Sequence, residues 1–139
     1  MAALLHDLSL DDTFYENIGE WNSRGKNRAD KTPETEKYRS HVREAIEQMG
    51  TIPNLPPDID QIILQHHELP DGSGFPNGIM ANRISPLAAI FIFSEDLAMS
   101  ILPGMDIRSA AEEFVKLNRA KYSAGVFRKI LNAFEEGLS

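Results

Sequence analysis

The sequence predicts an all-α protein of about five to six helices, and two observations support this fold class. Apolar residues recur at intervals of three and four along most of the chain, and no segment alternates apolar and polar residues for long enough to make a half-buried strand. Two pairs, Thr32-Pro33 and Ser85-Pro86, each join a side chain that caps helices to a proline suited to the first helical position. We therefore expect a helical bundle in a single domain over residues 1–139.

The first part of the chain is predicted to hold little regular structure before one long helix. Residues 2–8 are typical of the end of a helix, and the polar segment 9–31 is predicted to be mainly a loop. The long helix begins after Thr32, carries acidic residues in its first turn, and ends at about Met49, before Gly50.

The next helix follows Pro56 and Pro57 and has an apolar stripe that ends in two histidines. Ile59, Ile62 and Ile63 form this stripe. The same spacing of three and four reaches His66 and His67. We therefore expect both imidazoles on the buried face of the helix.

The third predicted helix, from Leu87 to about Leu102, is apolar nearly all round and should form the core. Glu95 and Asp96 interrupt it, and Glu95 shares a face with apolar residues (Ala88, Phe91, Ile92 and Met99). A carboxylate on such a face is costly to bury without a cation, although Asp96 is an alternative inward group. After a break at Pro103-Gly104, two further helices are expected at about 107–118 and 123–136, with stripes typical of ordinary packing.

Composition limits the classes of function. The 139 residues include no cysteine, so any metal must be held by imidazole and carboxylate groups. The net charge of −7 argues against general nucleic-acid binding. No apolar run approaches the roughly 20 residues that span a bilayer, and the first residues do not resemble a signal peptide, so a cytoplasmic location is the default expectation.

Half of the basic residues nevertheless cluster in one part of the sequence. Seven of the fourteen lie between positions 24 and 43: Arg24, Lys26, Arg28, Lys31, Lys37, Arg39 and Arg43. They form either a solvated surface or a local electrostatic attraction for an anionic ligand.

Six side chains are candidate metal ligands because they are polar groups on or beside apolar faces: His6, Asp7, His41, His66, His67 and Glu95. They are too many for one tetrahedral ion, and they suit two ions that clamp a phosphate and lower the pKa of a shared water. For a lone helical histidine such as His41, a structural role is the usual alternative.

A glycine-rich turn follows the paired histidines. Its sequence, from Asp71 to Pro76, makes a good loop with no function required. It lacks the lysine and helix start of a P-loop, which excludes that kind of triphosphate site. Gly72, Ser73, Gly74 and Phe75 are candidate substrate-binding residues, because the glycines allow a close backbone approach and the ring offers a stacking surface.

The segment from His66 to Gly78, HHELPDGSGFPNG, resembles the signature of the HD-GYP family, a branch of the all-helical, metal-dependent HD superfamily. His6-Asp7 is similar to the pair that names the superfamily, and Glu95 falls at the place of a later ligand. The resemblance implies an HD-superfamily helical bundle whose first helices are missing here, and two divalent ions, iron or manganese. It also implies that Asp7 bridges the ions and that a metal-activated hydroxide hydrolyses cyclic di-GMP or a related phosphoester to a linear dinucleotide or GMP.

The sequence departs from that family at several positions. Leu8, Ser9 and Leu10 replace a segment that carries a phosphate-binding lysine, Phe75 replaces the signature tyrosine, and no arginine-rich segment follows the core helix. Two further hypotheses therefore stand beside the enzyme. One is an impaired module that binds metal, a cyclic dinucleotide or a protein partner in signalling, and the other is a helical interaction domain without metal.

Overall fold

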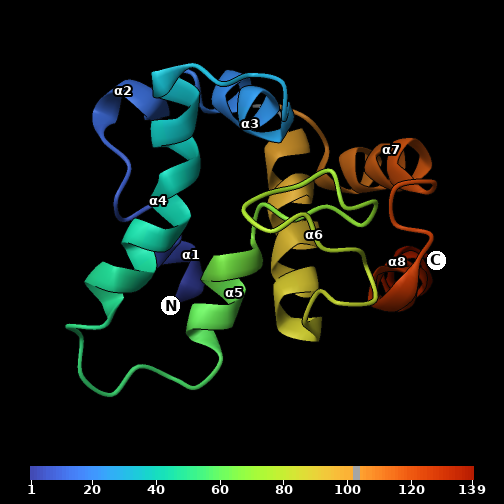
Figure 1. The fold of residues 1–139 in the computed structure, drawn as a ribbon. Coiled ribbons are helices and arrows are strands. Elements are labelled where there is room, and N and C mark those ends of the chain that lie inside the picture. Colours follow the sequence, from blue (N-terminus) through green and yellow to red (C-terminus); the bar gives the residue numbers. More distant parts are fainter. Residues whose placement is uncertain (102–103) are drawn as a thin grey trace.

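The computed structural model describes residues 1–101 and 104–139, which form an all-helical fold (Figure 1). No strand occurs in these two ranges, apart from an isolated bridge between Asp71 and Met80. The described residues form eight helices rather than the five or six expected: α1 (Ala2–Leu5), α2 (Asp12–Tyr15), α3 (Ile18–Lys26), α4 (Pro33–Met49), α5 (Ile59–Gln65), α6 (Pro86–Ser100), α7 (Ile107–Asn118) and α8 (Gly125–Leu138).

The sequence signals for the longer helices are confirmed. The Thr32 side chain accepts a hydrogen bond from the backbone amide of Thr35, and the Ser85 side chain accepts one from the amide of Ala88. These bonds satisfy amides that the first turn of a helix leaves without partners. The expected end of the core helix at Leu102 and the break at Pro103 lie outside the described residues.

The prediction of a loop over residues 9–31 is wrong, because α2 and α3 lie within it. Phe14 and Trp21 pack edge to face with their ring centroids 5.0 Å apart, and both rings lie against Tyr38 of α4. Burial of these rings stabilises α2 and α3, although the polar sequence of these two helices shows little of the apolar periodicity that predicts a helix. As a result, α3 packs on α4 and lies near one end of α6 (Figure 1).

The buried side chains form three clusters around the candidate ligands. The largest joins α6, α7 and α8 through residues such as Phe93, Phe114 and Phe127. A second is made by Phe14, Tyr38, Val42 and Phe75, and a third by Ala45, Met49, Ile59 and Ile63 between α4 and α5. The helices α4, α5 and α6 thus form a packed layer, and α7 and α8 cover the other side of α6 (Figure 1).

Among the described residues, no helix has both the length and the apolar character needed to cross a membrane.

Candidate metal centre

Four of the six predicted ligands converge on one point in the described structure. One ligand atom each from Asp7, His41, His66 and His67 lies within 4.8 Å of the other three. The three imidazoles are buried and Asp7 is half-buried. They come from the residues just after α1, from the middle of α4 and from the end of α5, so the helix packing brings them together.

The other two predicted ligands lie on the far side of Asp7. His6 Nε2 is 3.1 Å from Asp7 Oδ2 and 3.4 Å from Glu95 Oε1. His41 Nε2 and His66 Nε2 lie 3.5 Å and 3.9 Å from the other oxygen, Asp7 Oδ1. The Asp7 carboxylate therefore stands between two ligand groups, one with His6 and Glu95 and one with the three buried histidines.

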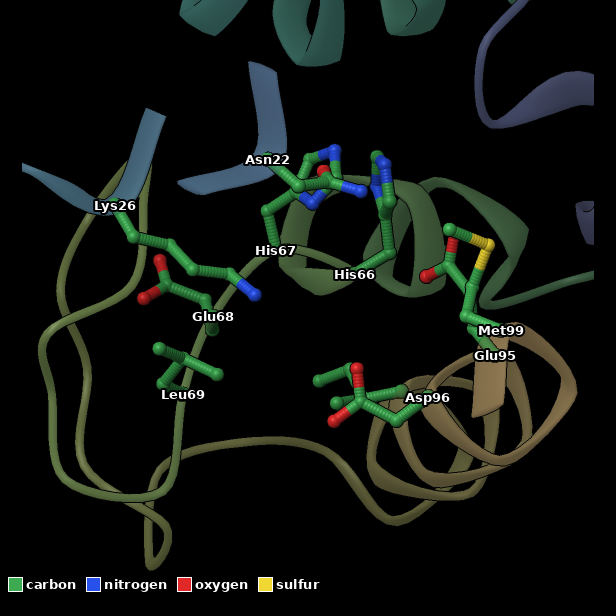
Figure 2. A pocket seen from close by; sticks show the side chains of 10 residues that line it. Asn22, Lys26, His66, His67, Glu68, Leu69, Glu95, Asp96 and Met99 are labelled. Atoms are coloured by element: carbon green, nitrogen blue, oxygen red, sulfur yellow. The ribbon is translucent and has the colours of Figure 1, made fainter. Parts of the chain in front are cut away.

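The Asp96 carboxylate takes a different direction from that of Glu95. Its Oδ2 atom accepts hydrogen bonds from Lys121 Nζ and Tyr122 Oη, next to the core around α8. Glu95 is thus the α6 carboxylate that contacts the histidines, and Asp96 is held by the packing of residues 121–122. Both carboxylates still line the pocket shown in Figure 2.

Backbone carbonyl groups fix the orientation of two imidazoles. His66 Nδ1 lies 2.7 Å from the carbonyl oxygen of Ile63, and His41 Nδ1 contacts the carbonyl oxygen of Tyr38. In each case Nδ1 must carry the hydrogen to donate, which leaves the Nε2 lone pair free. The two Nε2 atoms are 3.5 Å apart and face Asp7, as metal-binding imidazoles do.

Burial keeps the three histidines neutral. It lowers the pKa of His66 to about 3, lowers the pKa of His67 well below its usual 6.5, and lowers the pKa of His41 in the same direction. His6 behaves in the opposite way. Although burial opposes it, hydrogen bonds to Asp7 and Glu95 raise the pKa of His6 to about 10. In the metal-free protein, a protonated His6 thus occupies the space between two carboxylates.

Two buried polar atoms in the centre have no hydrogen-bond partner within the described residues, namely Asp7 Oδ1 and His6 Nδ1. A buried carboxylate oxygen without a donor is costly. Asp7 Oδ1 also faces the free Nε2 atoms of His41 and His66, which are acceptors when neutral. A cation between these three acceptors satisfies all of them at once, so the residues fit a divalent metal.

The glycine-rich turn packs behind His67. The Phe75 ring is 4% exposed and stacks on the His67 ring at 4.5 Å between centroids. The predicted stacking surface is therefore covered by a candidate ligand. Gly74 is also buried, and a Cβ there would overlap the His67 carbonyl oxygen and the Leu69 amide nitrogen. Ser73 is exposed, and its amide and hydroxyl bond to Asp71 within the turn, next to half-buried Gly72.

Glu68 holds this turn and was not singled out from the sequence. Its side chain is fully buried, and its two oxygens accept hydrogen bonds from the backbone amides of Asn77, Gly78 and Ile79 at 2.8, 3.2 and 3.0 Å. Because Glu68 directly follows His67, these bonds tie the far side of the turn to the end of α5. Only its position in the signature segment pointed to it.

Tyr38 also contributes to the centre without having been predicted. Its hydroxyl donates to Asn22 Oδ1 at 2.6 Å and lies 3.5 Å from His67 Nε2. The ring is fully buried in the second cluster, with Phe14, Val42 and Phe75. Tyr38 therefore links α3 to the candidate ligands.

The comparison with known proteins identifies the family of this chain. A family model described as the HD domain matches residues 1–122. Curated proteins gave no match, and neither did solved structures.

Proposed function

The chain belongs to the HD-domain family, and from that premise we propose that the centre binds divalent metal and hydrolyses a phosphoester, with cyclic di-GMP as the substrate that the signature segment favours. One observation carries the proposal. Asp7 Oδ1, which no described group satisfies, faces two neutral imidazoles whose Nε2 lone pairs also point inward. Three acceptors that converge in a buried site need a cation.

The six candidate ligands form two groups, and each group would hold one ion. Asp7, His41, His66 and His67 would hold one. His6, Asp7 and Glu95 would contribute to a second, with His6 in its neutral form. Asp7 would thus bridge the two ions, and iron and manganese both suit a ligand set of imidazoles and carboxylates. When bound, such ions act as Lewis acids on a phosphoryl oxygen and lower the pKa of a coordinated water.

The side chains around the centre would hold its ligands in place. The rings of Tyr38 and Phe75 both contact the His67 ring, and Glu68 anchors the turn that carries Phe75. We assign Gly74 and Phe75 to the positioning of His67. Gly72 and Ser73, which are less buried, remain candidates for contact with the substrate, although they do not line the pocket beside the centre. The pocket beside the centre opens between α3, the end of α5 and α6 (Figure 2).

The alternative is a module that binds metal or a cyclic dinucleotide without turnover, or that contacts a protein partner in signalling. The segment after His6-Asp7 favours it, because this segment brings no cation to the centre. Leu8 is exposed, the Ser9 hydroxyl donates to the His41 carbonyl oxygen, and Leu10 packs on the Phe14 cluster.

The deciding experiment measures metal and activity in the same sample. The full chain is purified anaerobically, its iron and manganese per chain are determined, and the sample is assayed with cyclic di-GMP. His66→Ala and His67→Ala test the ligands, and Gln48→Ala, on the exposed surface of α4, is the matched control.

Metal together with hydrolysis supports the enzyme, and metal without hydrolysis supports the binding module. Both are overturned if the chain takes up no metal, or if the two histidine variants retain the metal content of the Gln48→Ala control.

A further inference from the structure

The pocket beside the metal centre has two hydrogen-bond donors on its α3 side. Asn22 and Lys26 are separated by one helical turn and both line this pocket, together with His66, His67 and the α6 carboxylates. In Figure 2 the Lys26 side chain extends past Glu68 into the pocket, and Asn22 lies next to the two histidines. Both residues lie in the segment that the sequence predicted to be a loop.

Lys26 is half-buried, and within the described residues its ammonium group forms no hydrogen bond or ion pair with an anionic group. Lys31, Lys37 and Lys121, by contrast, each form an ion pair with a carboxylate. Burial lowers the pKa of Lys26, and Asp96 and Glu95 oppose that shift from a distance. A cation in such a place is poorly compensated until an anion binds.

The acidic groups around Lys26 are already engaged. Glu68 accepts three backbone amides, Asp96 accepts from Lys121 and Tyr122, and Glu95 contacts His6. Lys26 is therefore not needed to neutralise any of them. Its charge remains available to a ligand.

Asn22 presents a hydrogen-bond donor to the pocket because its acceptor atom is already occupied. Its Oδ1 atom accepts the 2.6 Å hydrogen bond from Tyr38, which fixes the orientation of the amide. The Nδ2 group is then the end that remains for the pocket, and it can only donate. An ammonium and an amide N–H group on one wall recognise oxygen atoms of an anion such as phosphate.

We propose that Lys26 and Asn22 bind the phosphate oxygens of the phosphoester that the metal centre hydrolyses. This inference rests on the proposed function and assigns the phosphate-binding wall of the same site to α3. The candidate metal ligands His66, His67 and Glu95 would lie on one side of the phosphate, and the two α3 donors would hold its oxygens from the other.

The test compares Lys26→Gln with wild type and with the matched control Lys31→Gln, which changes an exposed lysine. Inorganic phosphate is titrated by calorimetry into the manganese-loaded full chain, and the KM and kcat for cyclic di-GMP are measured on the same samples. We expect Lys26→Gln to weaken phosphate binding and raise KM by roughly tenfold or more, as for a lost charge-assisted hydrogen bond. Manganese content and melting temperature should match those of Lys31→Gln, and Lys26→Arg should restore part of the affinity.

A second variant examines Asn22 without loss of its bond to Tyr38. Asn22→Asp keeps an acceptor for the Tyr38 hydroxyl, replaces the donor with a carboxylate oxygen, and should weaken phosphate binding at least as much. The inference is overturned if both variants bind phosphate like wild type, or if wild type binds no phosphate. The proposed function fails separately if wild type takes up no manganese, and phosphate titration of the metal-free chains then still decides the role of Lys26.

Discussion

The Nε2 atoms of His41 and His66 lie 3.5 Å apart although the residues are 25 positions apart in the chain. Two neutral acceptor nitrogens at this separation do not attract each other, and their rings meet edge to face at 5.5 Å between centroids. The packing of α4 against α5 imposes the arrangement, because each Nδ1 is bound to a carbonyl oxygen of its own helix. The fold thus brings two candidate ligand atoms together without the help of a metal.

Replacement of Asp7 by Asn should remove most of the stabilisation that metal gives. Asp7 contributes an oxygen to both ligand groups, and a neutral amide is a far weaker ligand. For wild type, manganese at a hundred times its Kd should add about 2.7 kcal/mol to the free energy of unfolding. The measurement is the melting temperature with manganese and with a chelator. Asp12→Asn, which changes an exposed carboxylate on α2, is the control, and an equal metal-induced shift in both variants would contradict the bridging role.

The stability of the metal-free protein should fall on both sides of neutral pH. The pKa of His66 is about 3 in the folded chain and 6.5 in the unfolded chain, so the unfolded state binds more protons between these values. Stability is therefore lost as the pH falls from 6.5, and His41 and His67 act in the same direction. The pKa of His6, raised to about 10, has the opposite effect: its contribution is full below 6.5 and is lost as the pH rises through 10.

Urea unfolding in the presence of a chelator, at intervals from pH 4.5 to 7.5, measures the acid side of this dependence. Between its pKa values in the folded and unfolded states, each histidine that is neutral only in the folded state changes the free energy of unfolding by about 1.4 kcal/mol per pH unit. His66→Gln should make the slope shallower by about one such increment. A variant slope equal to that of wild type would show that His66 is not held neutral by burial.

The convergence of the candidate ligands rests on residues that the sequence singles out through local signals. His66 and His67 continue an apolar stripe, and both are buried as expected. Glu95 lies on the apolar face of a helix with a clear cap and contacts His6. The spacing of three and four places such residues on one face whatever the rest of the fold does.

The walls of the site were not predictable, because they depend on contacts between distant segments. The helix α3 forms where Trp21 packs on Tyr38, and no pattern within residues 18–26 indicates that partner. From the sequence, Lys26 is one of seven basic residues that form either a solvated surface or an attraction for an anionic ligand, and nothing distinguishes it from the other six. The role of Glu68 depends on which backbone amides of the turn point inward, and the side chains of Asn77 to Ile79 do not encode that.

Removal of the Glu68 carboxylate should destabilise the protein and loosen the turn. Glu68→Ala leaves three amides without their buried acceptor, and we expect a loss of about 3 kcal/mol or more in the free energy of unfolding. Glu68→Gln should lose less, since one oxygen remains for Asn77 and Gly78 while an NH₂ group opposes the amide of Ile79. Urea unfolding measures both variants against Glu47→Ala, an exposed glutamate on α4. A loss no greater than that of the Glu47→Ala control would remove Glu68 from this role.

A methyl group at Gly74 should impair metal binding as well as stability. The backbone of the turn lies directly on the backbone of residues 67–69, so the Cβ of Gly74→Ala has no space unless His67 or Leu69 moves. Overpacking of this kind costs about 1–3 kcal/mol, and the displacement also shifts the His67 ring from its stacked position on Phe75. We expect a lower melting temperature and a weaker affinity for manganese, measured by titration of the metal-free protein.

The matched control is Gly137→Ala near the end of α8, where an added Cβ meets no atom within 4 Å. This substitution should leave manganese affinity unchanged and raise stability by up to about 1 kcal/mol, because alanine favours the helix over glycine. Comparison of the two variants thus separates the general effect of alanine on stability from the effect of displacing His67. If Gly74→Ala lowers stability but binds manganese like the control, the turn supports the fold without positioning the ligand.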